Sequence, residues 1–202
     1  MKNLYEVFIT LAMLLPVVTL ISKKILNVSY EALDMFWAFL ILIPPGFIGG
    51  TFSEHSAPLR PALQTWLFAP HIGAYMLSYV IMFKSAGPAC KGLFVSKENC
   101  KKTQRDLYCL VSFGFPLLTL GLLLGACWGQ KAWGSYWNWD PKELWSLASW
   151  LMFLVYFHVR YMNGLKYHRI TSLLALLGTV LVIITLLYAN LSKLFPGLHS
   201  YA

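Results

Sequence analysis

The sequence predicts an all-α fold, a polytopic bundle of about six helices embedded in a membrane. The chain has 202 residues, of which 58% are hydrophobic and only 12% are charged, whereas a soluble domain carries about 25% charged residues. Six segments approach the ~20 mostly apolar residues that cross a bilayer. We therefore expect a single membrane domain over residues 1–202, with two N-terminal helices in 1–60 and the core of the domain in 61–202.

The first two spans need separate justification. The first ends at Lys23 and Lys24 without a small-residue cleavage site, so we interpret it as a retained helix and not as a signal peptide. The second is the weakest because Pro44-Pro45 and Gly49-Gly50 interrupt it, and proline removes a backbone donor and kinks a helix. The six expected spans are 4–22, 34–52, 68–86, 107–128, 143–162 and 170–190.

The start of the fifth span carries its own signal. Asp140 is suited to be an N-cap, Pro141 to occupy the first helical position, and Glu143 to lie in the first turn. We therefore expect a helix to begin near 141, after a rigid outer loop or short interfacial helix over 129–139. The third, fourth and sixth spans rest on length and apolar content alone.

Basic residues predict the orientation, because cytoplasmic loops are enriched in Lys and Arg. Five belong to one set of alternate loops and to the termini: Lys2, Arg60, Lys131, Lys142 and Lys193. The other set of loops holds eleven: Lys23, Lys24, Lys84, Lys91, Lys97, Lys101, Lys102, Arg105, Arg160, Lys166 and Arg169. Both termini and residues 53–67, 129–142 and 191–202 are therefore expected on the extracytoplasmic side.

The net charge of +8 is thus explained by the membrane surface. The basic residues lie beside apolar spans and do not form one face interleaved with aromatic rings, so we expect no nucleic-acid binding. The four cysteines, Cys90, Cys100, Cys109 and Cys127, have no C-x-x-C spacing. This excludes a thioredoxin-like redox pair and a zinc knuckle and favours ordinary free thiols.

Residues 133–145 read WGSYWNWDPKELW and contain four of the eight tryptophans. Trp and Tyr are enriched at membrane interfaces, but a belt accounts for only two or three of these rings. Together with Tyr136, the four tryptophans are spaced 3, 1, 2 and 6 residues apart, which matches neither a helical face nor a strand. A dense group of flat rings at the outer surface suits a large, flat, apolar ligand.

The histidines suggest which ligand this is. His71 is expected in the first turn of the third span and His199 in the C-terminal tail, both on the outer side. Haem stacks on apolar rings, and its iron takes neutral imidazole as an axial ligand, although a lone interfacial histidine is also an ordinary polar residue. His158 is expected inside the fifth span, about 22 Å beyond Glu143 at 1.5 Å per residue. His55 and His168 are expected to be structural or solvated.

Three segments resemble a known family in the same order. The segment WGSYWNWDPKELWSLASWLMFLVYFHVR is similar to the tryptophan-rich "WWD" region of the haem-handling membrane proteins of cytochrome c biogenesis. It resembles the CcsA/ResC type of System II more than the CcmC type of System I. The segments PALQTWLFAPHIGAYMLSY at 61–79 and GLHSYA at 197–202 resemble those that carry this family's two external histidines. The resemblance covers residues 61–202.

The resemblance implies a role for particular residues. His71 and His199 would be the axial ligands of an external, non-covalent and transient haem b, held on a platform of Trp133, Trp137, Trp139 and Asp140. His158 would be one ligand of a second haem within the membrane. The family moves haem outward and attaches its vinyl groups to the two thiols of a Cys-x-x-Cys-His motif in apocytochrome c. This activity is that of a cytochrome c synthase subunit in the bacterial cytoplasmic membrane or its thylakoid equivalent.

The chain departs from the family pattern in two respects. It has six expected spans, where many CcsA-type proteins have more, and His158 is the only histidine expected deep in a span. We therefore expect a membrane partner of the ResB/CcsB type to supply the second inner ligand. Two alternatives stay open: a CcmC-type exporter or chaperone that presents haem without attaching it, and an electron-transfer cytochrome with two haems.

Overall fold

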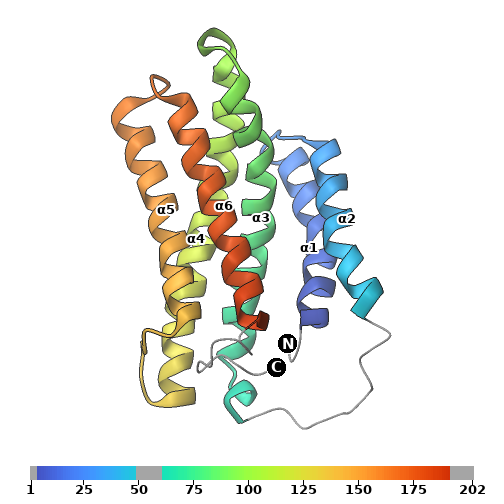
Figure 1. Ribbon diagram of the computed structural model, residues 1–202, viewed down its shortest axis with the longest axis vertical. Coiled ribbons are helices and arrows are strands. Elements are labelled where there is room, and N and C mark those ends of the chain that lie inside the picture. Colours follow the sequence, from blue (N-terminus) through green and yellow to red (C-terminus); the bar gives the residue numbers. More distant parts are fainter. Residues whose placement is uncertain (1–3, 49–60, 192–202) are drawn as a thin grey trace.

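The computed structural model describes residues 4–48 and 61–191. Its described part is all-helical, and each of the six expected spans corresponds to one helix, so the all-α class of the prediction is confirmed. Figure 1 shows the helices packed side by side and running alternately up and down. Two short 3₁₀ turns, η1 (Pro61–Gln64) and η2 (Lys97–Asn99), precede α3 and α4. The helices are α1 (Leu4–Lys24), α2 (Glu31–Ile48), α3 (Phe68–Phe94), α4 (Cys100–Trp133), α5 (Pro141–Asn163) and α6 (His168–Leu191).

Five helices, α1 and α3 to α6, are longer than the spans predicted for them. The predicted third span stopped at 86, but α3 continues to Phe94, and α4 extends the predicted 107–128 in both directions. Apolar content marks the membrane crossing, whereas a helix continues until its backbone is capped. Gly134 ends α4 in the left-handed conformation, with φ of 77°. The expected outer loop or interfacial helix at 129–139 is therefore corrected to a non-helical loop at 134–140.

Three helical segments are long and apolar enough to cross a membrane within the described residues: Tyr5–Lys24, Lys97–Trp133 and His168–Leu187. This supports a membrane bundle, while six crossings stay a prediction. The helix α2 continues through Pro44 and Pro45 to Ile48, as membrane helices tolerate when neighbouring groups satisfy the backbone. Gly49-Gly50 lie outside the described residues.

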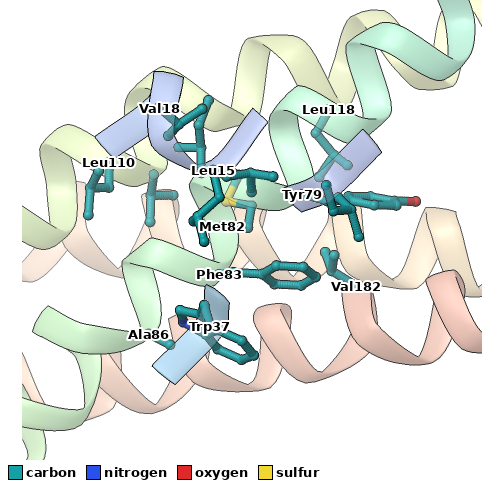
Figure 2. Packing of buried hydrophobic residues seen from close by; sticks show 14 of the residues in the cluster. Leu15, Val18, Trp37, Tyr79, Met82, Phe83, Ala86, Leu110, Leu118 and Val182 are labelled. Carbon is teal, nitrogen blue, oxygen red and sulfur yellow. The ribbon is translucent and has the colours of Figure 1, made fainter. Parts of the chain in front are cut away.

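Helix α3 lies at the centre of the bundle and packs against α4, α6 and α1. Its buried residues run almost continuously from Ala74 to Ala89, whereas a surface helix buries one stripe. Figure 2 shows Tyr79, Met82 and Phe83 of α3 among side chains of the neighbouring helices. The position of α3 brings His71, in its first turn, against the C-terminal half of α4.

The bundle has two chemically different ends. The aromatic end comprises the starts of α3 and α5, the end of α4 and the loop 134–140. The basic end comprises the connections 25–30, 95–99 and 164–167 with the adjoining helix turns, where ten of the described lysines and arginines lie. The start of α1 and the C-terminal end of α6 are at the aromatic end (Figure 1). Successive loops lie at alternate ends of the bundle, as expected. The side of the membrane on which each end lies stays a prediction.

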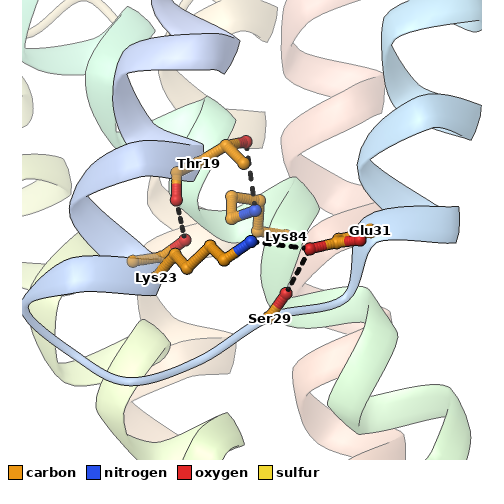
Figure 3. A network of polar contacts seen from close by, with 6 residues as sticks. Thr19, Lys23, Ser29, Glu31 and Lys84 are labelled. Carbon is orange, nitrogen blue, oxygen red and sulfur yellow. Dashed lines mark hydrogen bonds and ion pairs between the residues drawn. The ribbon is translucent and has the colours of Figure 1, made fainter.

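One basic residue was assigned wrongly. Lys84 was expected in a cytoplasmic loop, but it lies inside α3, where it is only 2% exposed. It forms an ion pair with Asp34 of α2 and donates to Thr19 Oγ1 of α1 at 3.3 Å. Figure 3 shows Lys84 beside Thr19, with the exposed pair Lys23–Glu31 nearby. Lys84 falls within the predicted span 68–86, so the error was to count it with the adjoining loop.

Candidate functional site

His71 occupies the first turn of α3 and is buried against α4. Its Nδ1 lies 2.9 Å from the carbonyl oxygen of Gly121. The imidazole stacks on Trp128, with ring centroids 5.7 Å apart and planes inclined by 12°, and meets Tyr75 edge-on at 5.1 Å. A carbonyl oxygen only accepts hydrogen bonds, so Nδ1 carries the proton. In the neutral ring, Nε2 then carries the lone pair.

A line of glycines on α4 allows this approach. A Cβ added at Gly125 would lie 2.6 Å from Cε1 of His71, and one at Gly121 would lie 2.9 Å from the Tyr75 ring. Further along, a Cβ at Gly114 would lie 2.9 Å from the Met82 side chain. Small residues let two membrane helices pack closely. The α3 side chains thus fill the spaces that the missing side chains of α4 leave.

Aromatic side chains continue from His71 across the end of α4. Trp128 is 2% exposed, and Trp133 meets it edge-on at 4.7 Å. Trp128 also packs on Phe68, whose ring lies 5.6 Å away. These rings form a small hydrophobic cluster with Leu63 and Leu67. One residue of the expected platform, Trp133, is therefore connected to His71 through Trp128.

The loop 134–140 carries the other expected platform residues. Trp137 and Trp139 meet edge-on at 6.0 Å. Trp139 has a positive φ of 57° and is 67% exposed; such a φ is uncommon for a residue other than glycine. The indole Nε1 of Trp137 is buried and has no hydrogen-bond partner among the described residues. The loop therefore combines an exposed ring with an unused buried donor.

Asp140 caps α5, as the sequence predicts. Its carboxylate accepts from the backbone N–H of Lys142 at 2.9 Å, and Glu143 Oε2 accepts from the backbone N–H of Asp140 at 3.2 Å. The same Glu143 oxygen accepts from the N–H of Asn138 at 2.8 Å. This reciprocal capping satisfies donors that a helix start leaves open. Both acidic residues therefore fix the course of the tryptophan loop.

The remaining expected ligands lie elsewhere. His158 follows Asp140 by 18 residues on α5, about 27 Å along the helix, and it is exposed on the flank of the bundle. His199 lies outside the described residues, so its convergence with His71 stays a prediction. Within the described ranges no three His, Cys, Asp or Glu side chains gather as a metal-ion site. All four cysteines are free, as expected.

Sequence reasoning missed Trp128, Gly121 and Gly125 as parts of the site. The segment GLLLGACWG carries a glycine every fourth residue from Gly121 to Gly129, the pattern typical of closely packed membrane helices. That pattern signals a close helix contact at this position. It does not indicate which helix makes the contact, so the partner, His71, emerged only from the fold.

These residues fit a haem. The contact with the Gly121 carbonyl assigns a proton of His71 to Nδ1. Of the three His71 ring atoms nearest to a Cβ built at Gly125, Nε2 is the farthest, at 3.5 Å. Trp139, Tyr136 and Trp66 are mostly exposed at the same end. Lys131 lies 5.2 Å from the centre of the Trp66 ring. Flat apolar rings with a nitrogen donor and a cation match a porphyrin with its iron and its carboxylates.

Comparisons with known proteins identify the family of the chain. The family model for cytochrome c assembly proteins matches residues 1–196. A cytochrome c biogenesis protein CcsA from Mesostigma viride is 28% identical over 243 aligned positions, covering 100% of this chain and 76% of the relative. Another from Prochlorococcus marinus (strain MIT 9303) is 30% identical, covering 99% of this chain and 74% of the relative. One from Gloeobacter violaceus is 44% identical over 118 residues, 58% of this chain and 34% of the relative.

The bundle and its tryptophan-rich end are those of a membrane protein for cytochrome assembly. The chain belongs to the cytochrome c assembly protein family, and within it the likeness is to the CcsA type. Since 243 aligned positions exceed the 202 residues of the chain, the Mesostigma relative carries internal segments without a counterpart here. The chain spans between about one third and three quarters of the length of these relatives.

Proposed function

We propose that the chain is the haem-handling subunit of a cytochrome c synthase. It would bring haem b to the extracytoplasmic face and present it for covalent attachment to apocytochrome c. Family membership supports the role in cytochrome c maturation. The observation that carries the proposal is His71, held at the aromatic end with Nδ1 on the Gly121 carbonyl and its ring on Trp128.

In this proposal His71 and His199 are the two axial ligands of the external haem. The C-terminal end of α6, from which the chain leads to His199, is at the same end of the bundle as His71 (Figure 1). Trp133, Trp137 and Trp139 provide the apolar platform, and Asp140 holds the loop that presents it. Lys131, at this end on α4, lies two residues before Trp133 and suits a haem carboxylate.

The aromatic end is extracytoplasmic in this proposal. Ten described basic residues lie at the other end, and positive charge favours the cytoplasmic side. The membrane would be the bacterial cytoplasmic membrane or the thylakoid equivalent. Attachment would therefore take place on the side where the tryptophan loop lies.

His158 is proposed as one ligand of an inner haem, completed by a ResB/CcsB-type partner. Its side chain is exposed on the flank of α5, next to the exposed Leu154 and Val155. A ligand on an outer flank needs a partner chain to supply the second histidine. If the purified chain alone showed bis-histidine haem that survived His71→Ala but not His158→Ala, this partner proposal would be wrong.

The chemistry requires positioning more than acid or base catalysis. The bound haem supplies the vinyl groups, and each thiol S–H adds across one of them, forming a C–S and a C–H bond without net oxidation. The residues at the aromatic end would hold the reacting groups in place, which lowers such a barrier by up to about 7–11 kcal/mol in ideal cases. Histidine ligation would last until the histidine of the incoming peptide replaces one of the two ligands.

The test is co-expression of the chain with a ResB-type partner and a c-type apocytochrome. We expect His71→Ala and His199→Ala each to abolish both the haem that co-purifies and the yield of holocytochrome, while His55→Ala, a histidine in the expected outer loop, leaves both unchanged. Normal yields in the first two variants would refute the external site. Haem that depends on His71 but never becomes covalently attached would instead identify a CcmC-type exporter.

A further inference from the structure

We infer that Gly121 and Gly125 are positioning residues for His71: the Gly121 carbonyl sets the tautomer of the imidazole, and the absent side chain of Gly125 sets where its ring lies. This inference rests on the proposed function, because it concerns how His71 is prepared to bind haem iron. It adds two residues of α4 to a site that sequence motifs place on α3, the tryptophan loop and the tail.

The tautomer follows from a single contact. The Nδ1 of His71 is 2.9 Å from the Gly121 carbonyl oxygen, which accepts and cannot donate. The proton is thereby held on Nδ1, and Nε2 is the nitrogen with the lone pair that an iron requires. A partner on the far nitrogen of a ligating histidine commonly fixes the tautomer and raises the basicity of the ligand. A backbone carbonyl does this without introducing a second titrating group.

The ring position follows from the lack of a side chain at Gly125. A methyl group there would lie 2.6 Å from Cε1 and 2.9 Å from Nδ1 of His71. The imidazole is confined on its other sides by Trp128, stacked at 5.7 Å, and by Tyr75, edge-on at 5.1 Å. A ring with neighbours on these sides cannot move away from Cβ without losing the stacking on Trp128 or the hydrogen bond to Gly121. Even alanine at 125 therefore displaces the ligand.

The chain offers a matched control on the same helix. Gly114 also faces α3, and a Cβ there would lie 2.9 Å from the terminal methyl group of Met82. Met82 is a flexible side chain that adapts to such a change. Gly114→Ala thus tests a similarly tight contact between α3 and α4 about three helical turns away from His71. A general loss of helix packing would affect both variants, whereas loss of ligand position affects Gly125→Ala only.

The first measurement needs no haem. The full chain is labelled with ¹⁵N-histidine and placed in lipid, and its His71 signals are assigned by comparison with His71→Gln. Solid-state NMR then reports which ring nitrogen of His71 carries the proton. We expect a neutral ring protonated at Nδ1. Protonation at Nε2 would overturn the inference whatever happens to haem. The tautomer is read in the unmodified chain, and the His71→Gln variant serves only to assign its signals.

The second measurement is haem titration of the purified full chain, followed by its absorption spectrum. We expect haem to bind Gly125→Ala about 10- to 100-fold more weakly, the usual effect of removing a ligand's supporting contact. Added imidazole should restore the low-spin spectrum of that variant, and Gly114→Ala should match the unmodified chain. Equal binding in Gly125→Ala, with His71→Ala still defective, would overturn the inference alone. An unmodified chain that binds no haem would refute the proposed function instead.

Discussion

The two ends of the bundle are held together by different chemistry. At the basic end, the Gln104 carboxamide donates to the His168 carbonyl at 3.1 Å and to Ser172 Oγ at 2.8 Å, and it accepts from Thr171 Oγ1 at 3.0 Å. These bonds connect α4 to the start of α6. At the aromatic end, rings lie against glycines, and side chains such as Trp139 and Trp66 remain exposed.

This difference indicates which end of the bundle is available to bind a ligand. The carboxamide of Gln104 is fully buried and both of its polar atoms are bonded within the chain, so its contacts serve stability. The aromatic end instead retains exposed rings and the buried indole donor of Trp137. An exposed aromatic surface at one end of a molecule is typical of an interaction site. The basic end is therefore expected to govern folding, and the aromatic end ligand binding.

The largest expected effect on stability comes from Lys84, in the half of the bundle nearer the basic end. Lys84→Ala would leave Asp34 buried without its cation, at a cost of about 3–5 kcal/mol in free energy of unfolding. The measurement is unfolding in mixed micelles. The double variant Lys84→Met with Asp34→Leu is expected to recover most of the loss, because no charge then remains buried. A loss in the double variant as large as in Lys84→Ala would contradict this account.

A smaller effect is expected at Gly92 of α3. A Cβ there would lie 2.2 Å from Ser172 Oγ and 2.9 Å from Gln104 Nε2, so Gly92→Ala should disturb the polar contacts and cost about 1–3 kcal/mol. Gly73→Ala is the matched control on the same helix, since a Cβ there has no atom within 4 Å. Both are compared by thermal unfolding in detergent. Equal stability of the two variants would show that the contacts of Gln104 are not tightly packed.

The smallest effect is expected at the aromatic end, where Asp140→Ala removes a helix cap and should cost about 1 kcal/mol. Asp140→Asn keeps a capping oxygen, so it should be nearly as stable as the unmodified chain. Thermal unfolding measures both variants, and haem titration separates the two roles of the residue. A stable Asp140→Asn chain that no longer binds haem would mean that the carboxylate acts on the ligand and not only on the loop.

The sequence predicted the positions of the helices better than the side-chain contacts between them. Apolar length located all six helices, and the Asp140-Pro141-Glu143 signal placed the start of α5 correctly. Lys84 was counted with a loop although it falls within the predicted span 68–86, because a lone charge is unfavourable inside a membrane; a partner on another helix, Asp34, allows the charge to be buried. That pairing depends on tertiary packing, which local patterns do not contain.

The same limit applies to the site. The tryptophan loop and His71 were expected as site residues because their residue types are unusual and match a family motif, and their role in binding stays a prediction. Trp128 and the two glycines that contact His71 and Tyr75 could not be assigned, because the residues they meet lie about 50 positions away along the chain. The spacing of the glycines indicates a close helix contact, and only the fold identifies the histidine that occupies it.

The most direct test of the central claim is a ligand exchange at His71. The absorption spectrum and midpoint potential of haem in the purified chain are compared for the unmodified protein, His71→Met and the control His55→Met. If His71 binds the iron, methionine at this position should change the spectrum and raise the potential, as methionine ligation does in cytochromes, while His55→Met leaves both unchanged. A haem whose spectrum and potential are the same in His71→Met as in the unmodified chain would contradict the account.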